Sequence, residues 1–157
     1  MLIKITNDQV FGMLNSMRNL DNVSGDAQFT RSLLKNQQTL GEHFKVVQDK
    51  IIQPPKEHAD FLQERRDITE PYKAAVVEAK KETKDLPDKD AYEASLKALE
   101  EKYADTITKF KENEEANGEL FKKEVELELR VILEEKVPKM TPAQMRPILP
   151  LIVDKIS

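Results

Sequence analysis

The segment from Lys56 to Asn117 constrains the fold most, because it combines a helical spacing of apolar residues with a high density of charge. After the sequence Asp85-Leu86-Pro87-Asp88, six apolar residues recur at spacings of three or four: Tyr92, Leu96, Leu99, Tyr103, Ile107 and Phe110. A less regular stripe precedes that sequence: Phe61, Leu62, Ile68, Tyr72, Val76 and Ala79. Each spacing places its residues on one face of a helix. A short connection between two such helices predicts an antiparallel helical hairpin.

Several residues predict where these two helices begin, bend and end. Asp88 or Asp90 is expected to cap the second helix, because a short carboxylate accepts hydrogen bonds from the free N–H groups of a first turn. The pair Asn117-Gly118 is expected to end it, since both residues tolerate the left-handed backbone of a helix end. Pro71 removes one backbone hydrogen bond, so we expect a kink or a restart near Glu70 in the first helix.

The N-terminal part predicts a short strand followed by a helix. Leu2 to Ile5 is a β-prone opening, and Thr6 precedes Gln9 by three residues. That spacing is a capping box, in which the threonine and glutamine side chains satisfy each other's backbone donors. Apolar residues then continue at helical spacing as far as Met17, and the turn formers of residues 19–25 end the helix.

A second N-terminal helix of about 25 residues is expected between Asp26, its cap, and Pro54-Pro55, which cannot continue it. Asn36 interrupts the apolar stripe of this helix and lies near its buried face. An asparagine in that position usually bonds to a neighbouring backbone group. We therefore expect backbone bonding at Asn36 in preference to ligand binding.

The C-terminal part changes from a helical period to an alternation. Four apolar residues alternate with charged ones: Val125, Leu127, Leu129 and Val131. Alternation predicts a strand with one buried face, and residues 119–122 are a candidate for a second strand. A strand needs a partner for its backbone groups, and Leu2 to Ile5 is the expected one. The run Val131 to Leu133 breaks the alternation, which indicates a bulge or deeper burial.

The end of the chain predicts a short helix that starts at Thr141-Pro142, with threonine as the cap and proline at the first helical position. Its inward side chains are expected to be Met145, Ile148 and Leu149. The final apolar residues should dock against the rest of the protein: Leu151, Ile152, Val153 and Ile156.

The predicted fold class is α+β, mostly helical: a long antiparallel helical hairpin, N-terminal helices, and a small sheet that joins the two termini. We expect residues 1–157 to form a single domain. Within it, residues 1–55 supply a strand and two helices, residues 56–118 the hairpin, and residues 119–157 the remaining strand and a short helix. The hairpin is expected to be an arm held out from a small body.

The charge distribution disfavours nucleic acid as a partner. Residues 1–53 carry six basic and five acidic side chains, residues 54–118 carry twelve and seventeen, and the remainder carries seven of each. No segment supplies the basic patch on which affinity for phosphate usually rests. The chain has no cysteine, which excludes disulfides, thiolate metal sites and cysteine nucleophiles.

The N-terminus lacks the features of a signal peptide, and no apolar run approaches the roughly 20 residues of a membrane helix. We therefore expect a cytoplasmic protein without a membrane partner.

The residue types that carry catalysis do not form a recognisable constellation. His43 and His58 have no metal-binding spacing, so ordinary surface histidines are expected. Asp85, Asp88 and Asp90 are close in sequence but lack the glycine and final glutamate of a calcium loop, so capping and solvation are the expected roles. No glycine-rich phosphate loop or serine elbow is present. The sequence predicts no enzyme and no cofactor.

The candidate partner contacts lie on the predicted hairpin. Arg65 and Arg66 stand between Glu64 and Asp67. The ordinary expectation is internal ion pairing, which contributes about 0–1 kcal/mol for an exposed pair. An arginine that faces outward is instead available to a partner. The acidic tip adds Asp85, Asp88 and Asp90 to these candidates, because an acidic surface steers toward a basic partner.

Several stretches together resemble a small family of phage-encoded accessory proteins without an assigned function. The opening resembles that family at Lys4 to Val10 followed by Leu14-Asn15, and again at the helix from Phe29 to Asn36. The charged middle that ends in Asn-Gly, the alternating strand and the Thr-Pro helix follow in the same order. The resemblance implies a phage or prophage origin, an accessory role and a host-cell cytoplasmic location. It implies no site residues.

The leading hypothesis is therefore a non-enzymatic protein–protein interaction module that binds a host or phage protein. The alternative is a virion-assembly or scaffold component that self-associates through the hairpin. A nucleic-acid binder is a further alternative, which the charge balance disfavours.

Overall fold

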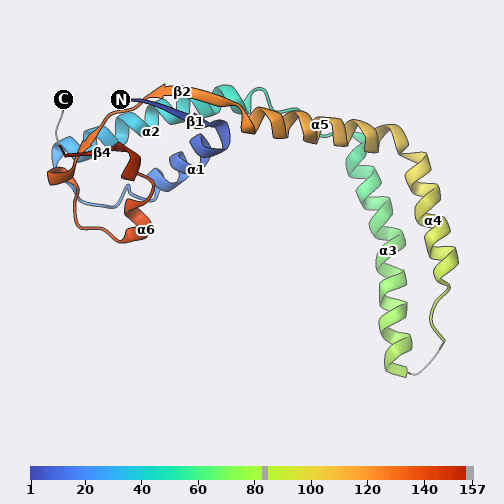
Figure 1. Cartoon of the computed structure of the whole chain (residues 1–157). Helices are drawn as coiled ribbons and strands as arrows, with labels where there is room; N and C mark the ends of the chain where they lie inside the picture. The colour runs from blue at the N-terminus through green and yellow to red at the C-terminus, as the bar shows by residue number, and fades with distance from the viewer. Residues whose placement is uncertain (83–84, 155–157) are drawn as a thin grey trace. The chain divides into compact units, whose positions relative to one another are not determined.

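The computed structural model describes residues 1–82 and 85–154 and is mostly helical, with two small sheets (Figure 1). The predicted α+β class is confirmed. Its internal contacts divide the chain into two compact units. Met1–Ile51 and Asn117–Ser157 form the first, called here the terminal unit, and Ile52–Ala116 form the second, called the hairpin unit.

The two ends of the chain meet in the first sheet, as the alternating pattern predicted. Strand β1 (Leu2–Thr6) pairs antiparallel with β2 (Glu124–Glu128), from Leu2 opposite Glu128 to Thr6 opposite Glu124. The predicted extra strand at residues 119–122 is wrong, because these residues form the last turn of a helix. The buried Asn7 binds the end of that turn: its side-chain amide donates to the Leu120 carbonyl at 2.7 Å, and its backbone N–H to that of Lys123 at 3.0 Å.

The break in the alternation marks a change of sheet. After Leu129 the chain leaves β2 and enters β3 (Ile132–Leu133), which pairs parallel with β4 (Ile152–Val153). Ile132 is fully buried, so the deeper burial expected at this point is confirmed. The pairing also confirms that the apolar end of the chain docks on the terminal unit. The predicted contact of Ile156 lies outside the described residues.

The helix caps of the terminal unit follow the sequence closely. Thr6 and Gln9 form the expected capping box at the start of α1 (Asn7–Arg18), with the Thr6 N–H donating to the Gln9 side chain at 2.8 Å. Asp26 caps α2 (Ala27–Gln48) and accepts from the N–H groups of Gln28 and Phe29, each at 2.9 Å. The backbone bond to Phe29 is the main reason that the pKa of the Asp26 carboxyl is lowered.

Helix α2 is shorter than expected. It ends at Gln48, ahead of Pro54, because the Asp49 N–H still bonds to the Lys45 carbonyl while Lys50 and Ile51 form tight turns instead. The terminal unit is completed by α6 (Pro142–Met145), which has the predicted Thr141 cap and Pro142 start, and by two 3₁₀ turns, Glu134–Lys136 and Leu149–Leu151.

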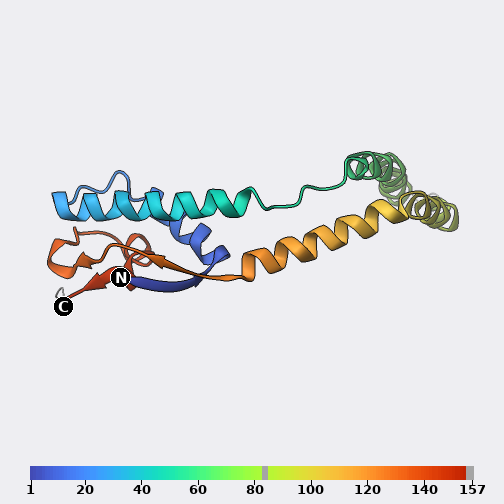
Figure 2. The same cartoon turned by 90° about the horizontal axis from the view of Figure 1, so that it is seen from above.

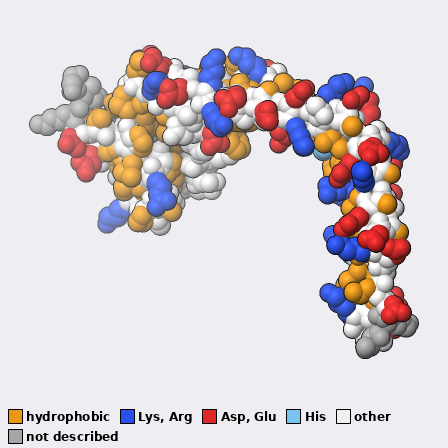
Figure 3. Space-filling model, turned by 45° about the vertical axis from the view of Figure 1, so that its right-hand side comes forward, with side chains coloured by type: hydrophobic (Ala, Val, Ile, Leu, Met, Phe, Trp, Pro, Cys, Tyr) orange, Lys and Arg blue, Asp and Glu red, His pale blue; other side chains and the backbone are white. Residues whose placement is uncertain are grey.

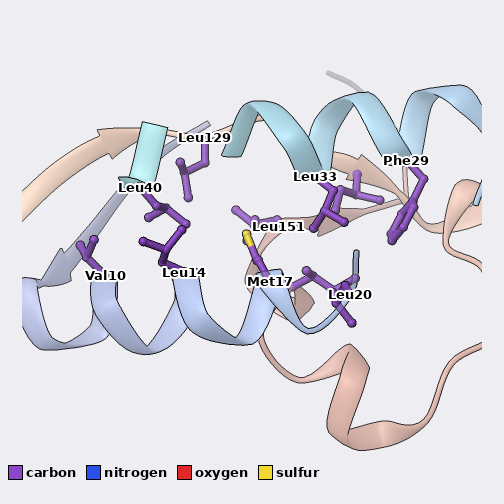
Figure 4. Packing of buried hydrophobic residues seen from close by; sticks show 11 residues of the cluster. Val10, Leu14, Met17, Leu20, Phe29, Leu33, Leu40, Leu129 and Leu151 are labelled. Atoms are coloured by element: carbon purple, nitrogen blue, oxygen red, sulfur yellow. The ribbon is translucent and has the colours of Figure 1, made fainter. Parts of the chain in front are cut away.

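One apolar core holds the terminal unit together. Figure 4 shows side chains of α1, including Val10, Leu14 and Met17, facing those of α2 and of the C-terminal segment. The remaining buried members of this cluster are Leu20, Phe29, Leu33, Leu40, Leu129, Ile132, Ile148 and Leu151. Leu149 was predicted to pack inward and is instead 54% exposed, because the 3₁₀ turn that it starts directs Leu151 inward in its place.

The hairpin unit contains α3 (Glu57–Glu82), α4 (Lys89–Lys102) and the first part of α5 (Ala104–Lys122). Helices α3 and α4 lie side by side in Figures 1 and 2, as the hairpin prediction required. Helix α3 continues without interruption through the exposed Pro71, so the expected restart near Glu70 does not occur.

The second arm differs from the prediction at two points. It breaks at Tyr103, whose φ of −108° and ψ of 21° end α4 before α5 begins. It then runs through Asn117-Gly118 to Lys122, so these residues do not end the helix. The left-handed backbone that the Asn-Gly pair permits is not used at Gly118.

Candidate functional site

The interface between α3 and α4, called here the seam, buries few side chains. Only Phe61, Ala79 and Leu99 of these two helices are buried, and the rings of Tyr72 and Tyr92 stack across the seam with centroids 4.0 Å apart. The predicted apolar stripes therefore meet each other. A two-helix seam leaves the other faces of both helices free for solvent or a partner.

At one end of the seam, aromatic rings take the place of aliphatic side chains. His58 stacks on Phe110 with ring centroids 3.9 Å apart, and Phe61 packs against Tyr103 at 5.6 Å. His58 is thus a packing residue of the hairpin unit. His43 belongs to the terminal unit.

Glu64 organises the polar contacts beside these rings. Lys102 Nζ donates to both of its carboxylate oxygens at 2.7 Å, and the Tyr103 hydroxyl donates to one of them at 2.7 Å. The hydrogen bonds from Lys102 and then Tyr103 lower the pKa of the Glu64 carboxyl. The bond to Glu64 raises the pKa of both Lys102 and Tyr103. This cluster anchors Tyr103, the residue at which α4 ends.

The same cluster determines whether the two candidate arginines, Arg65 and Arg66, have an acidic partner within the hairpin. Glu64 is occupied by Lys102 and Tyr103, and the Asp67 carboxylate accepts from the Gln63 side chain at 2.9 Å. Arg65 and Arg66 are both exposed, and neither forms an ion pair with any residue in the described part of the chain. The internal pairing considered from the sequence is therefore not present.

One exposed flank of α3 combines basic and apolar side chains at helical spacing. This flank, called here the α3 flank, consists of Leu62, Arg66, Thr69, Lys73, Val77 and Lys80. Leu62 is 40% exposed and Val77 is 51% exposed. Lys73 reaches only Glu70, at 4.0 Å. Arg65 is not on the flank, because consecutive helix residues point about 100° apart. Figure 3 shows basic, acidic and hydrophobic side chains mixed along the hairpin.

The acidic candidates at the tip have separate roles. Asp88 caps α4, with its carboxylate accepting from the Ala91 N–H at 3.0 Å, so it has a structural contact. Asp85 and Asp90 are exposed, and Asp90 lies in the first turn of α4. A carboxylate in a first turn interacts favourably with the helix dipole. Among the residues that the structure describes at the tip, Asp88 therefore has a capping contact, while Asp85 and Asp90 form no ion pair.

A buried polar contact in the terminal unit was missed by sequence reasoning. His43 Nε2 lies 2.8 Å from Asn7 Oδ1. Because Asn7 Nδ2 already donates to the Leu120 carbonyl, Oδ1 is the acceptor and His43 is the donor. No sequence signal marked Asn7, since His43 is 36 residues away in the chain and Leu120 is 113 residues away.

The partial burial of His43 makes the stability of the terminal unit pH-dependent. Burial, and then the charge of Lys50, lower the pKa of His43 below its ordinary 6.5. The unfolded chain therefore takes up the proton first as the pH falls. The stability that His43 contributes is fully present above the ordinary pKa of histidine, and it is lost as the pH falls through the lower pKa of His43 in the folded protein. We expect the Tm to decrease between about pH 7 and pH 5.

Thermal unfolding followed by circular dichroism across this pH range measures the effect. The His43→Gln variant should lack this decrease, whereas His58→Gln, the matched control, should retain it. An unchanged pH profile in His43→Gln would assign the decrease to other groups.

The described residues contain no group of three or more histidine, cysteine, aspartate or glutamate side chains placed to hold a metal ion. None of the helices within residues 1–82 and 85–154 is both long and apolar enough to cross a membrane. Comparison of the chain with protein-family models, curated proteins and solved structures gives no match. The resemblance to phage-encoded proteins therefore stays a prediction.

Proposed function

We propose that this chain is a non-enzymatic protein–protein interaction module, and that the α3 flank is the surface it presents to its partner. One observation carries the proposal: a helix of 26 residues exposes cations and apolar side chains together on one flank. Arg66 and Lys80 form no ion pair among the described residues, and the ion pair that joins α3 to α4, between Lys102 and Glu64, lies elsewhere on the hairpin.

The chemistry of the flank indicates the kind of partner. Arg66, Lys73 and Lys80 recur at spacings of seven residues, and Leu62 and Val77 lie on the same side of the helix. A partner helix with acidic residues and apolar anchors at matching spacing complements this arrangement. The accessory role implied by the phage resemblance places that partner among host or phage proteins.

Photo-crosslinking from two positions tests the proposal. A photoreactive amino acid at Val77 should capture a single protein from a bacterial host lysate, whereas the same group at the exposed Glu93 of α4 should not. Combining Arg66→Glu, Lys73→Glu and Lys80→Glu should reduce capture from Val77 at least about tenfold, because three rim charge pairs together contribute roughly 1.5 kcal/mol.

A matched variant separates the position of the charges from their number. Lys56→Glu, Lys109→Glu and Lys111→Glu make the same change in net charge within the hairpin unit but outside the α3 flank, and they should leave capture intact. Equal capture by all variants, or equal capture from both crosslinking positions, would refute the proposal.

A further inference from the structure

A cationic groove runs between α2 and the end of β2 in the terminal unit. Two adjoining hollows, of about 450 and 430 Å³, line this α2–β2 groove and share Arg130 and Val131. Arg31 and Ser32 of α2 border one hollow, and Lys35 and Thr39 border the other. The groove thus follows one side of α2 for about two helical turns.

The cations of this groove form no ion pair with any residue that the structure describes, although Glu128 borders the same hollow as Lys35 and Arg130. Arg31, Lys35 and Arg130 are exposed, and none forms an ion pair with another described residue. Lys35 Nζ donates only to the Gln38 side chain, at 3.2 Å.

Helix α5 carries the complementary pattern. Asp105, Glu112 and Glu115 lie along one exposed side of this helix, which also carries Lys109, and none of the three acids has an ion pair among the described residues. Glu112 and Glu115 are one helical turn apart, as are Arg31 and Lys35, and side chains at these spacings are about 5–6 Å apart.

We propose that the α2–β2 groove of one copy binds the acidic side of α5 of a second copy. Glu112 and Glu115 pair with Arg31 and Lys35, while Asp105 lies about two turns further along α5. This contact joins two different surfaces, so it is heterologous and adds further copies in the same direction. It goes beyond the proposed function, since the residues that it uses lie outside the α3 flank.

A protein helix fits the groove better than a nucleic acid does. Glu128 borders one of the two hollows and repels phosphate. Three cations also fall short of the six to ten phosphate contacts that typically give strong salt-dependent nucleic-acid binding. A helix places carboxylates only at selected positions, so it avoids Glu128.

Reciprocal charge reversal in the full-length protein tests this contact by sedimentation velocity. At low salt, the average mass of the wild-type protein should rise with concentration. It should return to that of the monomer at about 1 M salt, where the Debye length is about 3 Å. Arg31→Glu/Lys35→Glu should be monomeric, because its groove is acidic and so is its α5. Glu112→Lys/Glu115→Lys should also be monomeric, because both its groove and its α5 are basic.

An equimolar mixture of these two variants is the decisive sample. The acidic groove of the first variant meets the basic α5 of the second, and the basic groove of the second meets the acidic α5 of the first, so assembly should return. Arg18→Glu/Lys45→Glu makes the same change in charge outside the groove and should assemble like the wild type. A wild type that stays monomeric at every concentration overturns the proposal. So does assembly by either reversed variant alone, or a mixture that stays monomeric.

Discussion

Replacing Asn36 with leucine should lower the free energy of unfolding of the terminal unit by roughly 2–5 kcal/mol, because two backbone groups each lose a hydrogen bond worth about 1–3 kcal/mol when left unsatisfied. The fully buried Asn36 side chain donates to the Arg130 carbonyl at 2.9 Å and accepts from the Arg130 N–H at 2.6 Å. It therefore binds the edge of the chain just after β2 as a neighbouring strand would. Leucine has a similar volume but offers neither donor nor acceptor.

Unfolding in urea, followed by circular dichroism, measures this loss. The exposed neighbour Gln38→Leu is the matched control and should change stability by less than about 0.5 kcal/mol. All three tyrosines, Tyr72, Tyr92 and Tyr103, lie in the hairpin unit. Tyrosine fluorescence therefore reports whether the hairpin unit unfolds with the terminal unit or separately. A wild-type midpoint in Asn36→Leu would show that the paired amide does not hold the β2 edge.

Asn36→Asp separates the two hydrogen bonds. The carboxylate still accepts from the Arg130 N–H, but its second oxygen then faces the Arg130 carbonyl at the distance where the amide donated. When protonated, that oxygen donates again. We therefore expect Asn36→Asp to be less destabilised relative to the wild type at about pH 4 than at pH 7. Equal destabilisation at both values would indicate that only the bond to the N–H matters.

Asn36 also shows how far sequence reasoning reaches in this protein. Its place on α2 indicated that it lies near the buried face and bonds to backbone, and both predictions are confirmed. The identity of that backbone was beyond the sequence, because Arg130 is 94 residues away. Local patterns fix caps and periods, while the pairing of distant segments depends on packing in three dimensions.

The two errors in the hairpin prediction also arose from contacts between segments that are distant in the sequence. The stripe from Tyr92 to Phe110 is regular, so nothing local marked the break at Tyr103. The break instead accompanies the contact of Tyr103 with Glu64, which is 39 residues earlier. At Asn117-Gly118 the local signal favoured an end, but the helix continues until Asn7 binds its last turn. Tertiary contacts thus overrode local preference at both points.

The candidate partner contacts were likewise predicted only in part from the sequence. Arg66 was singled out by its sequence, and its exposure without an ion pair agrees with a role in binding. The rest of the α3 flank was not singled out, because Lys73 and Lys80 look like ordinary solvated lysines in the sequence. The spacing of Leu62, Arg66, Lys73 and Val77 was the signal that could have found it.

Substituting Gly25 with alanine should destabilise the terminal unit by about 1–3 kcal/mol, the usual effect of an extra carbon in a filled core. A Cβ at this position would lie 2.9 Å from Cγ of Phe29 and closer still to Cδ1. Phe29 is fully buried in the core cluster, so its ring has no free space into which to move. Sequence reasoning assigned Gly25 only to a turn, and its close approach to Phe29 was not visible there.

Gly12→Ala is the informative counterpart, because the same change should there increase stability by about 0.5–1 kcal/mol. Gly12 lies inside α1, and nothing in the described structure approaches within 4 Å of a Cβ at that position. Alanine restricts the unfolded chain without meeting any obstacle in the folded one.

Urea unfolding of both variants should move their midpoints in opposite directions. Adding Gly25→Ala to a Phe29→Leu background should cost less stability than adding it to the wild type. A Gly25→Ala midpoint at or above that of the wild type would show that Phe29 is free to move, and that the packing at the start of α2 is looser than the buried ring implies.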